Sequence, residues 1–85
     1  MNKAQLVAAV NGVVQSYEPK KYEVWTIGVT GDAETRQTEH GNPKDWHQWP
    51  ADSDEIARSV EADFIKLGMK GGTGGLGKAN TVYIF

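Results

Sequence analysis

The chain has 85 residues and a mass of 9.3 kDa, which suffices for one hydrophobic core, so we expect a single domain over residues 1–85. Its 9 Lys and Arg against 11 Asp and Glu give a formal charge of -2, which excludes the strongly basic surface of a nucleic-acid coat protein. The absence of cysteine excludes disulfides, cysteine zinc sites and thiol nucleophiles, and indicates a cytoplasmic protein. No apolar run approaches the about 18 residues of a membrane span, and no signal peptide is visible, so we expect no membrane partner.

The first predicted element is a helix over Lys3 to Tyr17, with Asn2 as its N-cap. One helical face carries the apolar residues of this segment, which are Leu6, Val10, Val13, Val14 and Tyr17. Asn11-Gly12 is also a hairpin signal, but the alanine content of the segment favours the helix. Pro19 and the following lysine pair end the element.

A strand is predicted over Tyr22 to Thr30, because aromatic and β-branched residues dominate the segment. Both of its faces are apolar, so we expect a central strand that is buried on both sides. Gly28 lies inside it, where a glycine indicates the close approach of backbone, ligand or helix.

A short helix is predicted over Ala33 to His40, with Asp32 as N-cap and Gly41 ending it. Arg36 and His40 are four residues apart and so lie on one face of this helix. These two side chains either recognise phosphate and move protons or belong to a solvated surface.

The segment Asn42 to Asp52 is predicted to be a loop, in which Trp46 and Trp49 either close the open side of the domain or serve as anchors for a partner. A metal site formed by His40, Asp45 and His47 is a further alternative, although the loop fixes no ligand geometry.

A third helix is predicted to begin with a capping box of Asp52 and Glu55 and to end at Gly68. Its core stripe is Ile56, Ala57, Val60, Phe64 and Leu67. Glu61 lies beside this stripe, where it either holds a hard divalent cation or pairs with a basic residue at the surface. The last element is a buried strand over Thr81 to Phe85.

Glycine is the one compositional anomaly, with 10 of 85 residues and a concentration between Gly68 and Gly77. Residues 72–77 match G-x-G-x-x-G, but a phosphate-binding loop follows a strand and precedes a helix, and here the predicted order is reversed. We therefore expect no nucleotide cofactor. The stretch is interpreted as a connector that returns the last strand to the sheet, or else as an anion-binding nest.

Together these elements predict an α+β domain with the order helix-strand-helix-helix-strand, in which about three helices pack on a small antiparallel sheet of two to three strands.

The segment Thr26 to Thr30, followed by Arg36 and His40, resembles the central motif of the GIY-YIG nuclease superfamily. In that family a strand ending in Tyr-Ile-Gly-x-Thr leads into a capped helix that carries an Arg and then a His. The third helix is similar too, since Ala57, Glu61 and Ile65 have the spacing of the family's Ala, metal-binding Glu and aliphatic residue. The resemblance covers about Tyr22 to Gly68 and implies a GIY-YIG-like fold.

The resemblance implies a metal-dependent endonuclease in which Glu61 holds Mg²⁺ or Mn²⁺, Arg36 stabilises phosphoryl charge, and Tyr83 or His40 activates water. Thr26 stands where the family has a catalytic Tyr. A local basic rim for nucleic acid is expected from four lysines, namely Lys20, Lys21, Lys70 and Lys78.

The family's Gly-Ile-Tyr strand is missing from its usual place, where Tyr17 lies on a predicted helix. Val82-Tyr83-Ile84 reads like that strand moved to the other end of the chain, which is a circular-permutation hypothesis. It requires Tyr83 and Arg36 on one side of the sheet near Glu61. Two alternatives stay open: a catalytically inactive GIY-YIG-like module that binds nucleic acid or a protein partner, and a plain α/β domain with a coincidental match.

Overall fold

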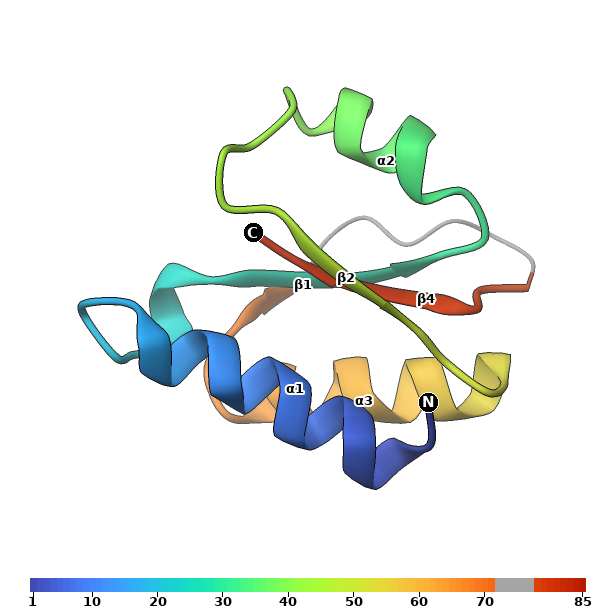
Figure 1. The fold of residues 1–85 in the computed structure, drawn as a ribbon, viewed down its shortest axis with the longest axis horizontal. Helices are drawn as coiled ribbons and strands as arrows, with labels where there is room; N and C mark the ends of the chain where they lie inside the picture. Colours follow the sequence, from blue (N-terminus) through green and yellow to red (C-terminus); the bar gives the residue numbers. More distant parts are fainter. Residues whose placement is uncertain (72–77) are drawn as a thin grey trace.

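A four-stranded mixed sheet with the strand order β2-β4-β1-β3 organises the computed structural model, which describes residues 1–71 and 78–85 (Figure 1). The elements in chain order are α1 (Lys3–Ser16), a 3₁₀-helix η1 (Tyr22–Val24), β1 (Thr26–Thr30), α2 (Ala33–Glu39), β2 (His47–Pro50), α3 (Asp54–Lys66), β3 (Lys70–Gly71) and β4 (Thr81–Ile84). The predicted α+β class is therefore confirmed. The interpretations of the glycine run at 72–77 lie outside the described residues.

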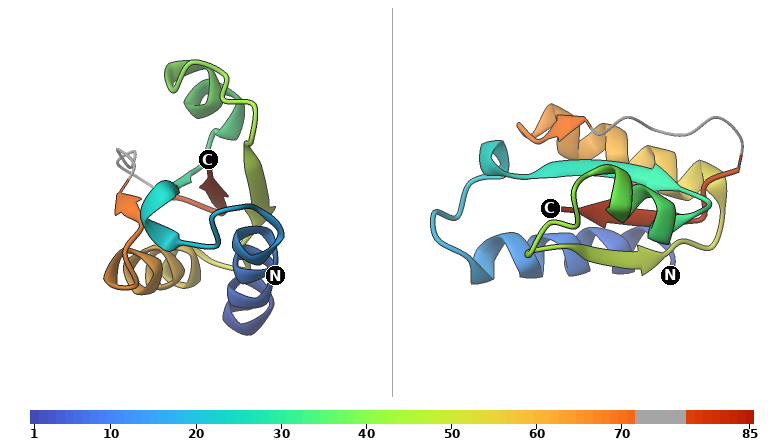
Figure 2. Two further views of the ribbon diagram at one scale, coloured as in Figure 1. Left: turned by 90° about the vertical axis from the view of Figure 1, so that its left-hand side faces the viewer. Right: turned by 90° about the horizontal axis from the view of Figure 1, so that it is seen from above.

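The sheet has more strands than expected and is not purely antiparallel. β4 pairs antiparallel with both β1 and β2, while β3 pairs parallel with β1. α1 and α3 cover one face of the sheet and α2 covers the other (Figure 2). The predicted loop between α2 and α3 is thus partly wrong, because it contains β2, whose residues His47 to Pro50 pair with Ile84 to Thr81.

The hydrophobic core lies between the sheet and the helices α1 and α3. Both helices contribute the residues spaced three and four apart that periodicity predicts, and the strands contribute every second residue; these are Leu6, Val10, Val14, Ala57, Val60, Phe64, Ile27, Val29, Val82 and Ile84. α1 begins with the predicted cap, since Asn2 and Gln5 exchange backbone-to-side-chain hydrogen bonds of 2.9 Å. None of the helices within the described residues is both long and apolar enough to cross a membrane.

The strand β1 begins later than expected. Tyr22–Val24 forms a 3₁₀ turn closed by a 3.0 Å hydrogen bond from the Trp25 amide to the Tyr22 carbonyl. Val24 consequently remains 53% exposed, so the prediction that the whole segment from Tyr22 is a strand buried on both faces is wrong.

The ends of α2 and α3 also differ from the predictions. Asp32 caps α2 as predicted, but the last helical residue is Glu39 and His40 is the C-cap, followed by Gly41 with φ of 81°. α3 is capped by Ser53, whose hydroxyl accepts a 3.1 Å hydrogen bond from the Ile56 amide, whereas Asp52 binds the amino group of Met1. Two members of the predicted stripe are not buried: Ile56 is half-buried and Leu67 is 51% exposed.

Candidate active site

Tyr83 is the centre of the candidate site. Its neighbours Val82 and Ile84 pack in the core, so strand alternation turns Tyr83 to the opposite face, where α2 lies. Gly28 is its partner on β1, and a Cβ at that position would overlap the Tyr83 hydroxyl. This close approach explains why the interior of β1 contains a glycine.

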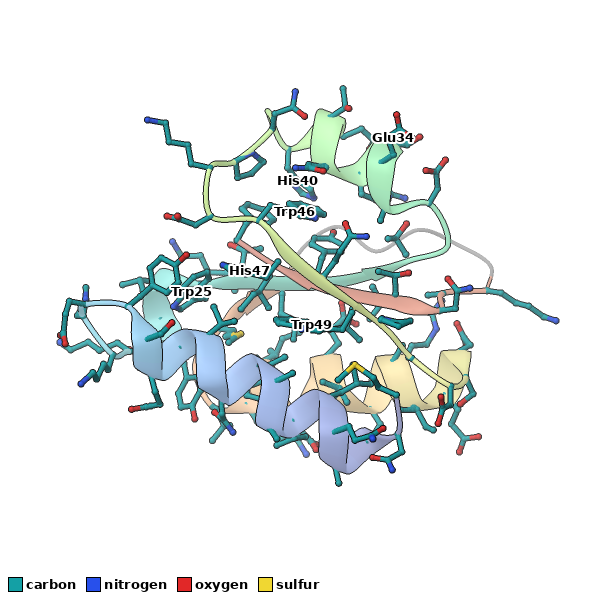
Figure 3. The ribbon with its side chains drawn as sticks, viewed as in Figure 1. Trp25, Glu34, His40, Trp46, His47 and Trp49 are labelled. Atoms are coloured by element: carbon teal, nitrogen blue, oxygen red, sulfur yellow. The ribbon has the colours of Figure 1, made fainter. Side chains whose placement is uncertain are left out.

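Three aromatic side chains surround the Tyr83 ring, and we call the four residues His40, Trp46, Tyr83 and Phe85 the aromatic cluster. Trp46 stacks on Tyr83 with ring centroids 4.5 Å apart, and the ring centroids of His40 and Phe85 are 4.6 Å apart. His40 Nε2 is 3.2 Å from the Tyr83 hydroxyl, a hydrogen bond whose donor depends on the histidine tautomer. Figure 3 shows His40 and Trp46 between α2 and the sheet.

Charged groups from two helices act on the Tyr83 hydroxyl. Burial raises the pKa of Tyr83, the positive charge of Arg36 opposes this rise, and the negative charges of Glu61 and Glu39 add to it. Arg36 belongs to α2 and donates a 3.0 Å ion-pair hydrogen bond to Glu39. Since the net shift is upward from the ordinary tyrosine value, Tyr83 keeps its proton at neutral pH.

Glu61 of α3 is half-buried, and burial raises the pKa of its carboxyl while the positive charge of Arg58 opposes the shift. Its carboxylate makes no hydrogen bond or ion pair with any other residue that the structure describes. No group of three or more acidic or histidine side chains suited to a metal occurs in residues 1–71 and 78–85. A single free carboxylate fits a Mg²⁺ or Mn²⁺ ion that keeps most of its water ligands.

The other residues considered for catalysis or metal binding lie apart from the aromatic cluster. Tyr17 is on the side of the sheet that faces α1, where its hydroxyl is 3.1 Å from Nε2 of His47. Within β2, His47 shares this side with Trp49, whereas His40 lies beneath α2 (Figure 3). The alternative of a metal site at His40, Asp45 and His47 is therefore wrong, because the two imidazoles are on opposite faces of the sheet.

Thr26 begins β1 and exchanges backbone hydrogen bonds of 2.8 and 3.0 Å with Phe85. The four lysines expected at a basic rim are all exposed but are not gathered in one place. Lys20 and Lys21 lie in the loop after α1, Lys70 is in β3, and Lys78 precedes β4, so that the first pair and the last lysine are at opposite ends of the molecule (Figure 1).

Trp46 and Phe85 were not predicted to belong to the site. Trp46 and Trp49 are both half-buried, but on opposite faces of the sheet, because Trp46 stacks on Tyr83 while Trp49 stacks on His47. The residues His47–Pro50 show no alternation of polar and apolar types that could have indicated a strand; half-buried and exposed side chains alternate only once β2 pairs with β4.

Comparison with known proteins identifies no relative: no family model matches the chain, and no curated protein or solved structure matches it. The GIY-YIG relationship therefore stays a prediction, carried by the residues and their geometry.

Proposed function

We propose that the chain hydrolyses phosphodiester bonds in a nucleic acid at the site around Tyr83, with Glu61 holding one Mg²⁺ or Mn²⁺ ion. The observation that carries this proposal is the hydrogen bond between His40 and the Tyr83 phenol beneath α2, the helix that also carries Arg36. The charges of Arg36 and Glu61 both act on the pKa of Tyr83, although Glu61 belongs to α3, which covers the opposite face of the sheet (Figure 2).

The arrangement of β1 and β4 supports the circular-permutation hypothesis. Tyr83 pairs with Gly28 across an antiparallel ladder, and it is on the same side of the sheet as His40. A strand carrying this tyrosine next to the strand of the Thr-Ile-Gly motif is what a permuted GIY-YIG-like domain requires.

In the proposed reaction, the Tyr83 phenol orients the attacking water, because it is protonated at neutral pH and serves as a hydrogen-bond donor and acceptor. It takes a proton from the water as it passes its own proton to Nε2 of His40, 3.2 Å away. The water oxygen bonds to phosphorus as the bond from phosphorus to the leaving oxygen breaks, and the leaving oxygen takes a proton from the His40 imidazolium or from solvent. Arg36 leaves Glu39 and stabilises negative charge on the phosphoryl oxygens with its planar guanidinium. Glu61 would hold the Mg²⁺ or Mn²⁺ ion, which would supply Lewis-acid stabilisation of negative charge.

A second candidate is a GIY-YIG-like module that binds nucleic acid or a protein partner without cleaving anything. Three observations favour it: Thr26 provides no second phenol, Arg36 is already paired with Glu39, and Tyr83 is fully buried. Water and phosphate reach Tyr83 only if the side chains of the aromatic cluster move aside, and the two candidates differ in whether that movement occurs.

The test is incubation of the full chain with plasmid DNA and with single-stranded RNA in Mg²⁺ or Mn²⁺. We expect metal-dependent nicking and metal-dependent NMR shifts centred on Glu61, and loss of about 100-fold or more of the rate in Glu61→Gln. Glu55→Gln is the matched control, because Glu55 is an exposed carboxylate of the same helix.

Metal-dependent shifts at Glu61 together with oligonucleotide shifts at Arg36, without cleavage, would support the binding module. A cleavage rate that Glu61→Gln leaves unchanged would contradict the proposed site.

A further inference from the structure

A second site is visible at the end of the sheet where α1 ends. A pocket of about 230 Å³ opens there between the loop after α1 and the loop before β2. Its lining includes three aromatic residues, Tyr17, Trp25 and Phe85, and two acidic residues, Glu18 and Asp45. Phe85 also belongs to the aromatic cluster, whereas Arg36, His40 and Tyr83 do not line the pocket.

The aromatic walls are held in place by contacts outside the pocket. Tyr17 meets Trp25 edge-on, with ring centroids 5.0 Å apart and planes at 85°, and its hydroxyl is bonded to His47. Trp25 is 4% exposed, and Phe85 packs against His40. A ligand would therefore find walls that are already ordered, which lowers the entropic cost of binding.

The chemistry of the lining selects for a positive charge with an apolar surface. Aromatic faces attract cations through their quadrupole, and the two carboxylates add a negative field at the same place. An anionic group, such as phosphate, would be repelled. Lys20 Nζ lies 3.5 Å from a Glu18 carboxylate oxygen and offsets part of that charge, so Asp45 contributes more of the negative field.

We propose that this pocket binds an alkylammonium group. The volume of about 230 Å³ is several times the roughly 30 Å³ that one water occupies in the liquid, so it accepts a group of several heavy atoms such as a methylated ammonium. The group is carried either by a small amine or by a lysine side chain of a protein partner. The pocket shares Phe85 with the aromatic cluster, but the proposed binding does not depend on phosphodiesterase activity.

Titration of the full chain with choline and with 3,3-dimethyl-1-butanol, its uncharged analogue of the same shape, tests the proposal by NMR. We expect choline to shift the signals of Tyr17, the Trp25 indole and Phe85. The alcohol should bind at least about tenfold more weakly than choline. Equal affinity for the two compounds would overturn the proposal, because the pocket would then select only for apolar shape.

Two variants probe the walls and the charge separately. Asp45→Asn should weaken choline binding about threefold and Tyr17→Leu more strongly, while Glu55→Gln, an exposed carboxylate outside the pocket, should leave it unchanged. Asp45 is exposed, so its variant should keep the fold. Choline affinity that is the same in Asp45→Asn and Tyr17→Leu as in the native chain would also overturn the proposal.

The source of the ammonium group is distinguished by a further comparison of probes. A peptide with a central trimethyl-lysine is titrated beside choline and spermidine. Tighter binding of the peptide assigns the pocket to a lysine side chain of a partner, and tighter binding of the free amines assigns it to a small molecule.

Discussion

Along β4, Val82 and Ile84 contact the aliphatic residues of α1 and α3, whereas Tyr83 between them lies among aromatic and polar side chains beneath α2. The first face has two helices of 14 and 13 residues, and the second has one helix of 7 residues with no buried side chain. Successive residues of one strand thus serve two different environments.

The face covered by α1 and α3 stabilises the fold, and the face covered by α2 contains the aromatic cluster. The α1–α3 face excludes water from aliphatic surface, which is the dominant favourable term in folding. A helix as short as α2 is unstable alone, so its position depends on Asp32 as its cap and on the aromatic cluster. We therefore expect the α2 face to be less stable than the face covered by α1 and α3.

The largest expected effect is on the α1–α3 face. Phe64→Ala should lower the free energy of unfolding by about 3–5 kcal/mol, because Phe64 is 1% exposed and the substitution leaves a cavity between α3 and the sheet. Urea denaturation followed by circular dichroism measures the loss. The comparison is Phe85→Ala on the other face, which should lower the free energy of unfolding less because this ring is only half-buried. Equal losses in the two variants would contradict the division between the faces.

A smaller effect is expected where the two strands meet beneath α2. Gly28→Ala should cost about 1–3 kcal/mol, because the new Cβ overlaps the Tyr83 ring, which is itself stacked on Trp46. Gly12→Ala in α1 is the matched control, since nothing lies within 4 Å of its Cβ and the helix should gain about 0.5–1 kcal/mol.

A double-mutant cycle shows whether Tyr83 causes the cost at Gly28. In a Tyr83→Leu background, Gly28→Ala should be less destabilising by at least about 0.5 kcal/mol. An undiminished cost would mean that the glycine is needed by the strand itself.

The sequence predictions were accurate where local interactions form the element and inaccurate where distant segments must pair. α1 and α3 were predicted because their apolar periodicity and capping signals are local. β2 and β3 were not, because β2 has 4 residues and β3 has 2, and each forms only by pairing with a distant strand. The cap of α3 was predicted one residue early, because Asp52 and Ser53 are both residue types that cap helices well. The Asp52 carboxylate instead pairs with the amino group of Met1, and Ser53 caps the helix.

The candidate site divides in the same way. Arg36 and His40 were singled out from their spacing on one helix, Glu61 from its place beside the core stripe of the next helix and from the family resemblance, and Tyr83 from the resemblance alone. Phe85 and Trp46 join them through stacking across β4, a contact between distant segments that no local pattern encodes.

The smallest expected effect on the free energy of unfolding is that of Glu61→Gln, which tests whether this carboxylate stabilises the fold. Burial disfavours the charged form of Glu61, so Glu61→Gln should raise the free energy of unfolding slightly near neutral pH, by less than about 1 kcal/mol because water screens the half-exposed carboxyl.

The pH dependence follows from the direction of this shift. The pKa of Glu61 is raised in the folded state, so its protonation favours folding: that contribution is complete below the ordinary glutamate pKa and is lost as pH rises through the raised value. The stability advantage of Glu61→Gln should therefore appear near neutral pH and shrink on acidification. Thermal unfolding of both proteins across this pH range measures it, with Glu55→Gln as the control. If Glu61→Gln were instead less stable at neutral pH, the carboxylate would be stabilising the fold, and its retention would need no catalytic explanation.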